Sequence, residues 1–561
     1  MKRFSALLFL CAASLLLVPR LLAADPNIVS YPLEQQLPAG SNAIFKVSAT
    51  GTAPLHYQWQ RNFTNLVDGG NIAGATSTNL IISNVSAADA APYSVVISNS
   101  IGTAQSSPVP LAILVPPIEW AFSTNIDGSD PQAGLLQAAD GNFYGTIFAG
   151  GLHGFGTVFK LSLNGTLTTL YAFTGSADGA NPASGLTQDA SGFLYGTTST
   201  GGVYGFGTVF RVSTSGQFTN LVTFDGTNGA TPKSGLVEGR DGNFYGTTSA
   251  GGTDDAGTIF RLTSAGLFST RYSFTNRIDG GVPLAGLTLA ADGAFYGTAF
   301  HGGLNLLGTV FRFTTNGQFT VLASFDGVAG ALPMAGLVQD NDGNFYGTTS
   351  ADGANLFGTV FKMDSNNTLS ALYSFGQQQD AFGNALDGAS PEASLLLAND
   401  GNLYGTTAYG GPFTNFIDAS GDIGAGAVFR ITTTGTFTDL LFFNGTNGQY
   451  PEAPLLQGTD GKLYGTTTTG GSFQDGTVFQ LDLGLPAFPP VFREVSPTGS
   501  TLALTWAAVP GKTYQLQYST NLPARGWSNL NSAITATNAT VTTSDSIGPD
   551  PRRFYRVQML P

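Results

Sequence analysis

Histidine and cysteine, which most often carry catalysis or bind transition metals, are scarce in this sequence of 561 residues. The three histidines, His56, His153 and His301, share no spacing that zinc sites use. Cys11 is the only cysteine, and the Gly-x-Ser-x-Gly phrase of a nucleophile elbow is absent. These residues indicate no catalytic constellation, so the sequence favours a binding protein over an enzyme.

Aspartate is the residue of chemical interest that recurs in a pattern. Repeated aspartates could bind calcium through their carboxylate oxygens. However, Asp-Gly in a two-residue hairpin also supplies the positive φ that such a turn demands. Ser191-Gly192 replaces Asp-Gly in one copy, which a ligand position would tolerate poorly, so we predict turns. The pairs begin at Asp140, Asp241, Asp292, Asp342, Asp400 and Asp460.

These aspartates belong to a longer phrase that recurs along the chain. Each copy resembles Pro-x-x-Gly-Leu, then Asp-Gly-Asn-Phe-Tyr-Gly-Thr-Thr, then Gly-Gly and Gly-Thr-Val-Phe. The tyrosines of successive copies are 51, 50, 51, 50, 58 and 60 residues apart. A fixed period of about 50 residues indicates stacked or radially arranged structural units. The tyrosines are Tyr144, Tyr195, Tyr245, Tyr296, Tyr346, Tyr404 and Tyr464.

Each copy contains four short runs that are rich in strand-forming residues and bounded by Gly, Asn or Asp. In the second copy these runs are Gly185–Gln188, Phe193–Thr198, Gly207–Val212 and Phe218–Phe224. Such runs predict β-hairpins, and no run has the length or period of a helix. Four strands in about 50 residues match the blade of a β-propeller.

The fourth strand is absent from the seventh copy, and an extra strand-like run precedes the first copy. The seventh copy ends at Gln480–Leu483, whereas Ile118–Phe122 leads into Asp127-Gly128 as the fourth strands of other copies do. Closing a ring would remove the free sheet edge. The sequence therefore predicts an all-β fold: a seven-bladed β-propeller over residues 118–484, closed by the N-terminal strand and flanked by two β-sandwich domains.

The Phe-Tyr-Gly-Thr-Thr and Gly-Thr-Val-Phe phrases resemble the Gloeo/Verruco (GloVer) tandem-repeat family of exported bacterial proteins. The resemblance covers about residues 128–483, and seven copies of the phrases carry it. It implies an exported protein associated with the cell surface. It implies no defined activity.

The chain before the repeats, residues 25–115, resembles an immunoglobulin-like domain. Trp59 lies in a run like strand C, and Asp89–Tyr93 has the spacing of a tyrosine corner. Val47 and Val95 stand where the cysteines of the usual disulfide would be. We therefore expect apolar packing of these valines against Trp59 in place of a bridge.

The two ends of the chain complete the predicted organisation. Residues 490–561 contain alternating strand runs around Trp506 and resemble a fibronectin type III-like β-sandwich. Residues 1–24 combine Lys2-Arg3 with an apolar run and small residues, which is typical of a secretory signal peptide. We therefore expect a protein that is secreted or displayed at the cell surface, without a transmembrane segment.

The acidic composition narrows the class of partner. The formal net charge is −14, which argues against nucleic acid and anionic membrane surfaces as main partners. Extracellular polysaccharide or a surface protein is the partner that we expect, and we expect a monomer.

Two long tyrosine-to-tyrosine gaps mark insertions, at Gly376–Ser390 and Pro412–Ala425. In a four-stranded meander both connections leave from the same face, and loops on a rigid scaffold commonly carry binding sites. Their aromatic rings and carboxylates predict a sugar-binding patch, although neutral variation in surface loops would also lengthen them. The sequence predicts no cofactor, but Asp418–Asp422 could hold calcium through oxygens. The candidate residues are Asp380, Phe382, Asp387, Phe413, Phe416, Asp418 and Asp422.

Three functions stay open from the sequence. The first, which we favour, is an exported binding or adhesion protein that recognises extracellular glycan through the propeller loops. The second is a carbohydrate-active enzyme on the propeller, either a hydrolase or a lyase. A hydrolase would need two carboxyl groups about 5–9.5 Å apart. The third is a purely structural component of the cell envelope.

Overall fold

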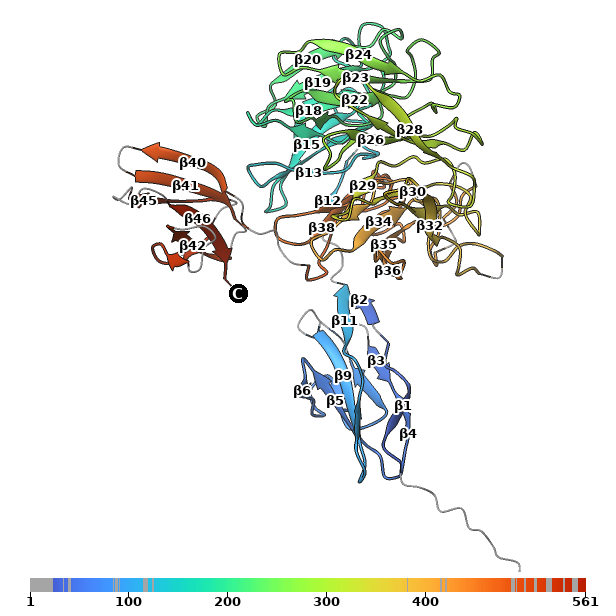
Figure 1. Ribbon diagram of the computed structural model, residues 1–561, viewed down its shortest axis with the longest axis vertical. Helices are drawn as coiled ribbons and strands as arrows, with labels where there is room; N and C mark the ends of the chain where they lie inside the picture. Colours follow the sequence, from blue (N-terminus) through green and yellow to red (C-terminus); the bar gives the residue numbers. More distant parts are fainter. Residues whose placement is uncertain are drawn as a thin grey trace, which may run out of the picture. The chain divides into compact units, whose positions relative to one another are not determined.

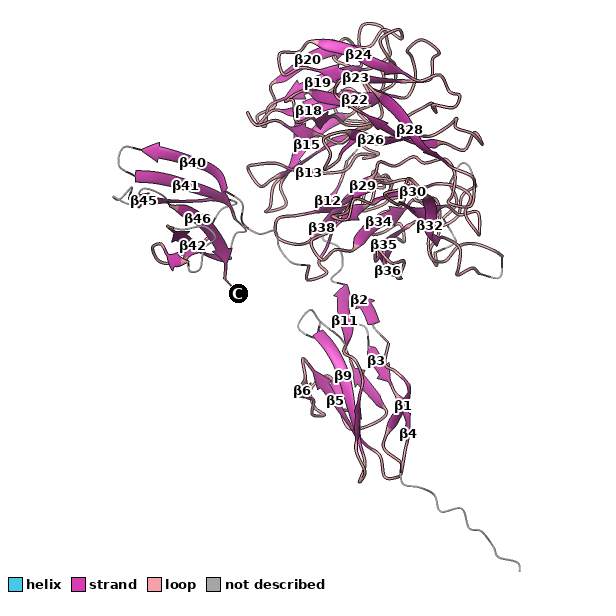
Figure 2. Cartoon of the chain, viewed as in Figure 1, coloured by secondary structure: helices cyan, strands magenta, loops and turns pink. Residues whose placement is uncertain are grey.

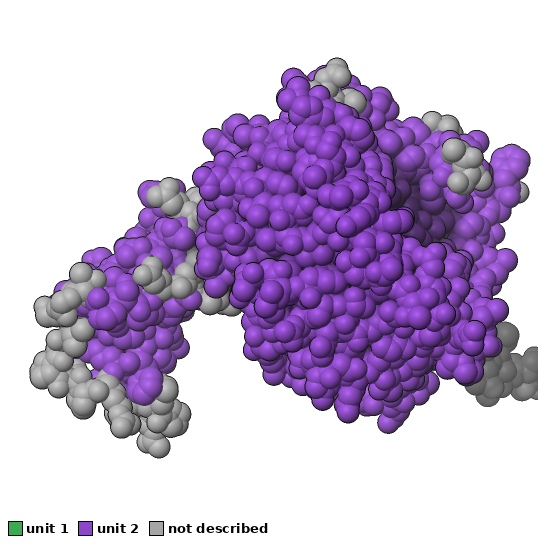
Figure 3. Space-filling model, turned by 90° about the horizontal axis from the view of Figure 1, so that it is seen from above, with its two compact units in different colours: residues 1–115 green, residues 116–561 purple. Residues whose placement is uncertain are grey.

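A computed structural model shows an all-β chain, and the described residues contain no α-helix (Figure 2). The chain divides into two compact units, residues 1–115 and 116–561. Residues of the second unit fill the view in Figure 3. The predicted signal peptide lies outside the described residues apart from Ala24, as do residues 115–119. The structure describes residues 24–33, 35–38, 42–83, 85, 89, 91–114, 120–123, 126–380, 382–413, 416–418, 421–485, 490, 492–498, 501–508, 512–520, 527–537, 540–546 and 553–560.

The first unit packs its sheets around Trp59, which is fully buried; all described strand pairs are antiparallel except β2 with β11, which is parallel. Val47 and Val95 belong to the same hydrophobic cluster, so the predicted disulfide-free core is confirmed. The Tyr93 hydroxyl donates to the Asp89 carbonyl oxygen at 2.9 Å, which is the predicted tyrosine corner. The sheets comprise β1 (Asn27–Ser30) with β4 (Ser48–Thr50); β2 (Gln35–Pro38), β11 (Val109–Leu114), β9 (Ala91–Ser98), β5 (His56–Arg61) and β6 (Thr64–Asn65), with β10 (Thr103–Gln105) on β9; and β3 (Ala43–Lys46), β8 (Asn79–Ile82) and β7 (Ile72–Ala73).

The repeats form seven four-stranded antiparallel sheets, which Figure 1 shows in chain order from cyan to orange. The first strands are β13 (Leu136–Gln137), β17 (Thr187–Gln188), β21 (Val237–Glu238), β25 (Thr288–Leu289), β29 (Val338–Gln339), β33 (Leu396–Leu397) and β37 (Leu456–Gln457). The second strands are β14 (Phe143–Ile147), β18 (Leu194–Thr198), β22 (Phe244–Thr248), β26 (Phe295–Ala299), β30 (Phe345–Thr349), β34 (Leu403–Thr407) and β38 (Leu463–Thr467). The third strands are β15 (Thr157–Leu161), β19 (Thr208–Val212), β23 (Thr258–Leu262), β27 (Thr309–Phe313), β31 (Thr359–Met363), β35 (Ala427–Ile431) and β39 (Thr477–Leu481). The fourth strands are β16 (Leu167–Ala172), β20 (Phe218–Thr223), β24 (Phe268–Ser273), β28 (Phe319–Ser324), β32 (Leu369–Ser374), β36 (Phe437–Phe442) and β12 (Trp120–Ala121).

The repeated Tyr-Gly and Val-Phe phrases are complementary halves of each sheet core. Gly145 pairs with Phe159 across β14 and β15, and a Cβ at Gly145 would lie 2.6 Å from the Phe159 ring. The corresponding glycine meets the corresponding phenylalanine in every copy. Glycine is needed here because the aromatic ring occupies the space of a side chain.

The fourth strand of the last sheet comes from the N-terminal side of the repeats. β12 pairs antiparallel with β39, with Trp120 opposite Val478, and the Phe122 amide donates to the Gly476 carbonyl, so the predicted pairing is confirmed for the described residues 120–122. Phe122 is fully buried, but Trp120 is only partly buried, because it lies at the edge of the core cluster.

Aromatic pairs join each sheet to the next and join the seventh sheet to the first. A phenylalanine just after each fourth strand packs on the third-strand phenylalanine of the next copy, with ring centroids 5.0–5.5 Å apart. Phe122 makes this contact with Phe159 of the first copy at 5.1 Å. Phe122 therefore occupies the place that six other phenylalanines occupy in their own copies.

A ladder of threonine hydrogen bonds follows the same order. The first threonine of each Tyr-Gly-Thr phrase donates to a backbone carbonyl of the next copy at 2.8–3.4 Å. The seventh bond runs from Thr466 to Ala133 of the first copy at 3.2 Å. These bonds satisfy buried hydroxyl groups that would otherwise be costly, and they link the first and last sheets directly.

The C-terminal sheets share one core around Trp506, which is fully buried as predicted for a core residue. Leu504 and Trp506 come from one sheet, whereas Tyr514 and Leu516 come from the other. This arrangement is that of a β-sandwich. The sheets comprise β40 (Phe492–Thr498), β41 (Thr501–Ala507) and β45 (Thr540–Ser546); and β43 (Ser528–Asn529), β42 (Thr513–Ser519), β44 (Ile534–Thr535) and β46 (Phe554–Met559).

Candidate functional site

Two sets of loops gather on one face of the repeats, which we call the long-loop face. One set joins each fourth strand to the first strand of the next copy, and the other joins second strands to third strands. A backbone bridge connects the two loops of every copy, from Ser129 with Ala149 in the first to Gln449 with Thr469 in the seventh. The long-loop face is therefore built the same way in all seven copies.

A cavity of about 200 Å³ opens where the seven copies meet. Each copy contributes residues that follow its repeated proline, and the residue directly after that proline varies in type. Four of these residues are uncharged, and the third copy contributes a lysine. The sixth and seventh copies contribute glutamates. In chain order these variable residues are Gln132, Ala183, Lys233, Leu284, Met334, Glu392 and Glu452.

The two glutamates of the cavity resist ionisation. Burial raises the pKa of Glu392 to about 7, and the charges of Asp422 and Asp418 act in the same direction. Burial raises the pKa of Glu452 to about 8, with further repulsion from Glu392, Asp130 and Asp418. Both side chains are therefore largely or partly protonated at neutral pH, when each could donate as well as accept a hydrogen bond.

The two insertions lie side by side on the long-loop face. The Gly411 amide, next to the second insertion, donates to the carbonyl of Ala385 in the first insertion at 3.0 Å. The Gly410 amide donates to the carbonyl of Ile423 at 2.8 Å. The prediction that both insertions rise on one face is therefore confirmed.

The three candidate aromatic residues differ in how accessible they are. Phe382 is 91% exposed and Phe413 is 39% exposed, so both present rings to solvent. Phe416 is half-buried and packs over Gly445, where a Cβ would lie 2.8 Å from its ring. Phe382 and Phe413 are therefore the rings that could stack on a ligand.

Asp387 is a correction to the predicted site. Only 1% of this residue is exposed. Its carboxylate accepts the Tyr373 hydroxyl at 2.6 Å and the amides of Gly376 and Gln377 at 2.9 and 3.0 Å. Asp178 and Asp279 hold the equivalent tyrosines of other copies. Asp387 thus makes a structural bond that recurs in the first, third and fifth copies, and its burial leaves no room for a ligand.

The remaining candidate aspartates shape their own loops. Asp380 accepts the amides of Phe382 and Asn384 at 2.8 and 2.9 Å, and these bonds lower its pKa. Asp418 accepts the Tyr409 hydroxyl and the Asp422 amide at 2.9 and 2.8 Å. Partial burial of its carboxyl group and the Asp418 charge raise the pKa of Asp422, although the residue as a whole is exposed to solvent. The described residues contain no cluster of three or more acidic, histidine or cysteine side chains suited to a metal.

The repeated Asp-Gly pairs are turns, as predicted, but of a different type. Only the glycine has positive φ, as at Gly141 (83°), and Gly141 donates its amide to the Ala138 carbonyl. This is the longer hairpin with a glycine bulge rather than the predicted two-residue turn. Sequence reasoning missed a second role of aspartate at this turn: in all seven copies an aspartate accepts the repeat tyrosine hydroxyl at 2.7–3.2 Å. This aspartate belongs to the Asp-Gly pair in five copies and is Asp189 or Asp340, two residues before the turn pair, in the other two.

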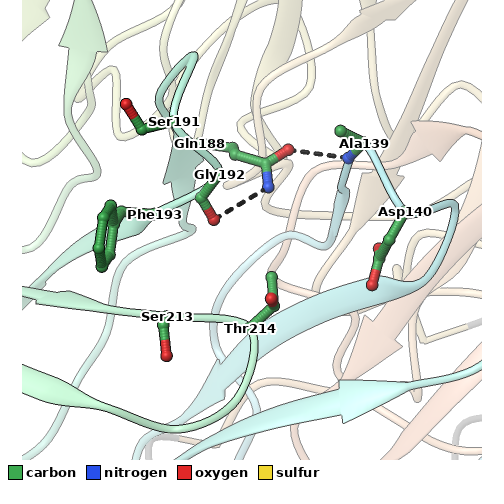
Figure 4. A pocket seen from close by; sticks show the side chains of 8 residues that line it. All are labelled: Ala139, Asp140, Gln188, Ser191, Gly192, Phe193, Ser213 and Thr214. Carbon is green, nitrogen blue, oxygen red and sulfur yellow. Dashed lines mark hydrogen bonds between the residues drawn. The ribbon is translucent and has the colours of Figure 1, made fainter.

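A second cavity, of about 260 Å³, lies beside these turns between the first two copies (Figure 4). Gln188 lies across it and accepts the Ala139 amide at 2.8 Å while donating to the Gly192 carbonyl at 3.2 Å. Gln137 makes the corresponding bond to the Thr459 amide of the seventh copy. The glutamine therefore joins neighbouring sheets, and we assign this cavity no function.

The comparison with known families decides the classification. The pattern of the Gloeobacter/Verrucomicrobia repeat matches residues 118–291, 235–417 and 288–488, which together exceed half of the chain. The chain belongs to the Gloeobacter/Verrucomicrobia repeat family. The immunoglobulin domain pattern matches residues 25–99 of this family member, in agreement with the disulfide-free core described above.

Solved structures similar to this Gloeobacter/Verrucomicrobia repeat protein match only a small part of it. Tandem Ig repeats of Dlar are 24% identical over 17% of this chain and 50% of theirs, with a TM-score of 0.16. Titin M4 is 21% identical over 16% of this chain and 98% of its own, with a TM-score of 0.15. Drosophila OTK extracellular domains 3–5 are 21% identical over 16% and 31% of the two chains, with a TM-score of 0.15. The chain thus spans half the length of the Dlar repeats.

Among the described residues, no helix has the length and apolar character needed to cross a bilayer.

Proposed function

We propose that the seven sheets are the blades of a closed β-propeller and that the protein is an exported binding or adhesion protein. The cyclic order of the phenylalanine pairs and threonine bonds supports the ring. The leader-like residues 1–24 support export to the cell surface or medium. In this proposal residues 25–115 and 490–561 are the flanking sandwich domains, and the latter is fibronectin type III-like.

Extracellular glycan is the ligand class that we propose for the long-loop face. The observation that carries this proposal is the pair of contacting insertions, which present Phe382 and Phe413 to solvent beside carboxylates. Aromatic rings offer flat apolar faces to sugar rings, while Asp422 could accept sugar hydroxyls. Among the candidate residues, we keep Asp380, Phe416 and Asp418 as residues that hold these loops in shape.

A glycan array probed with the full chain tests this proposal. We expect the Phe382→Ala/Phe413→Ala variant to lose glycan binding while its thermal unfolding stays unchanged. Phe473→Ala is the matched control, because Phe473 is an exposed phenylalanine of the seventh copy. Unchanged glycan binding in the double variant, or no glycan bound by the parent protein, would contradict the proposal.

A carbohydrate-active enzyme is the second candidate, and Glu392 and Glu452 favour it. They line one cavity, and their raised pKa values suit a general acid at neutral pH. Release of reducing sugar from polysaccharides should then fall by at least about a hundredfold in Glu392→Gln or Glu452→Gln, since general acid–base catalysis contributes about that much. If no reducing sugar is released from any polysaccharide that binds the protein, the enzymatic function is contradicted and only the binding function remains.

A further inference from the structure

Exposed apolar side chains of the repeats are concentrated on the long-loop face. Among the described residues of the repeats, the large apolar side chains that are exposed lie on its loops, apart from Leu163 and Leu267. Those two lie between third and fourth strands, on the opposite face. An exposed apolar surface that is confined to one face marks an interaction site, whereas scattered single residues need no explanation.

The apolar residues outside the insertions are mostly aliphatic. Leu152, Val203, Leu304 and Leu356, from the first, second, fourth and fifth copies, are 69–76% exposed. Each lies in the loop between the second and third strands: Leu152, Val203 and Leu304 directly follow the glycine pair of their copies, and Leu356 lies two residues further along, at the position of Leu306 in the fourth copy. We call these four residues the aliphatic rim. Leucine and valine lack the flat ring that stacks on sugars. The aliphatic rim is therefore suited to a different ligand from the glycan that we propose for Phe382, Phe413 and Asp422.

Charge on the same loops limits what can approach the rim. Every one of the seven loop pairs carries at least one carboxylate, and Lys233 and Arg277 are the lysine and arginine on these loops. The repeat cations lie elsewhere, near the short turns: Lys160 pairs with Asp140 at 3.3 Å and Arg312 with Asp292 at 2.8 Å. The long-loop face is therefore both apolar and negatively charged.

We propose that the aliphatic rim docks a protein segment that carries basic side chains next to aliphatic ones. Aliphatic contacts would supply affinity, and the surrounding carboxylates would attract lysine or arginine and repel acidic partners. The same charge disfavours an anionic membrane and a second copy of this acidic chain. This docking site is distinct from the proposed glycan-binding residues Phe382, Phe413 and Asp422, because its four residues lie outside the two insertions.

Fluorescence anisotropy with the full chain tests the proposal. The probe is a short labelled peptide of alternating lysine and leucine, compared with one in which glutamate replaces lysine and one in which serine replaces leucine. We expect the lysine–leucine peptide to bind at least about tenfold more tightly than either control peptide. We expect added salt to weaken this binding. Equal binding of all three peptides would overturn the proposal.

Two multiple variants locate the binding. Leu152→Ser/Val203→Ser/Leu304→Ser/Leu356→Ser should weaken peptide binding by about tenfold or more. The control Leu163→Ser/Leu267→Ser removes exposed leucines from the opposite face and should bind as the parent does. The rim side chains are exposed, so both variants should keep the parental circular dichroism spectrum and melting temperature.

Other outcomes would overturn the rim as a protein-docking site. Loss of binding in both variants would show general apolar adhesion. Concentration-dependent dimers of the parent that the rim variant abolishes, without peptide binding, would assign the rim to self-association. Loss of glycan binding in the rim variant, with peptide binding intact, would assign the rim to glycan. The glycan-binding result for Phe382→Ala/Phe413→Ala tests only the proposed glycan site on the two insertions. The glycan proposal and the peptide-docking proposal can therefore be contradicted independently.

Discussion

Glu392 and Glu452 place ionisable groups in the cavity where the seven copies meet. Their position in this cavity determines their pKa values. In each copy the residue after the repeated proline faces this cavity, and only the last two copies supply glutamate. Because the cavity is small, both carboxyls lose water, and burial raises each pKa. A pair of partly protonated carboxyls makes the charge of this cavity depend on pH around neutrality.

The raised pKa values predict that stability falls as pH increases. Between the unfolded value of 4.5 and the folded values of about 7 and about 8, the folded protein binds more protons than the unfolded chain. The free energy of unfolding therefore decreases across this window, by an amount on the order of 5 kcal/mol between pH 5.5 and 8.5. Urea unfolding at pH 5.5 and 8.5 measures the slope.

Glu392→Gln/Glu452→Gln supplies the control for this pH dependence. Glutamine keeps the size and polarity of the side chain but does not titrate, so the slope between pH 5.5 and 8.5 should become much smaller. Glu238→Gln changes a glutamate that does not line the cavity and should keep the parental slope. A slope that is the same in all three proteins would contradict our account of the cavity.

Trp59 provides a second prediction at the scale of one residue. It is fully buried, and its indole nitrogen donates to the Ser77 carbonyl at 2.8 Å. Because no disulfide supports this core, Trp59→Ala should lower the stability of the immunoglobulin unit by about 3–5 kcal/mol. Urea unfolding followed by circular dichroism measures the loss. Val67→Ala, at a residue that is 79% exposed, is the control that should leave stability nearly unchanged.

Sequence reasoning predicted elements better than it predicted side-chain roles. The repeated strands agree with the structure to within a residue or two, because alternating strand formers between glycines leave few alternatives. Asp387 was misjudged because the first insertion separates it from the tyrosine it serves. In uninterrupted copies, Tyr171 and Asp178 lie close enough in sequence to reveal the pair. Comparing Asp387 with those copies would have identified it as structural.

The sequence analysis did not predict Glu392 and Glu452, because it selected candidate residues from the two unusually long loops. A signal was present: in the repeated phrase that begins with proline, the residue after proline ranges from alanine and leucine to lysine and glutamate, whereas the next residue is always alanine or serine. A variable position inside a repeated phrase is typical of a surface that faces a ligand or a cavity rather than the packed core. The meeting of seven such positions in one cavity requires the closed order of the sheets, which spacing alone does not give.

In the proposed propeller, closure of the ring depends on β12. Its Phe122 packs on Phe159 of the first copy, and its backbone pairs with β39 of the last. We expect Phe122→Ala to destabilise the repeats by about 3–5 kcal/mol, as large-to-small changes in buried aromatic residues do. Phe173→Ala removes the equivalent ring between the first and second copies and should cost a similar amount. Urea unfolding followed by tyrosine fluorescence measures both.

The exposed Phe382→Ala variant is the control for this pair. Its ring makes no core contact, so its unfolding midpoint should match that of the parent. If Phe122→Ala behaved like Phe382→Ala while Phe173→Ala were destabilised, β12 would not be equivalent to the other fourth strands.

At the scale of the whole molecule, the repeats combine rigidity with one variable face. Threonine bonds, phenylalanine pairs and glutamine clamps recur between copies, whereas loop length, exposed apolar residues and cavity residues differ. Repetition thus fixes the scaffold, and its largest departures, the two insertions, lie on the long-loop face. Such a division suits a protein whose task is to present a binding surface.

Closure itself can be tested by moving β12. If β12 completes the last sheet, a variant of residues 128–483 without it exposes the edge of β39 and should melt at a lower temperature than residues 118–483. A permuted variant, in which residues 118–127 follow β39 through an Asn-Gly turn, should regain the melting temperature, because β39 and β12 are antiparallel neighbours. Calorimetry of the three proteins decides the matter. A permuted variant no more stable than residues 128–483 would mean that β12 acts through its connection to the preceding unit rather than by completing the sheet.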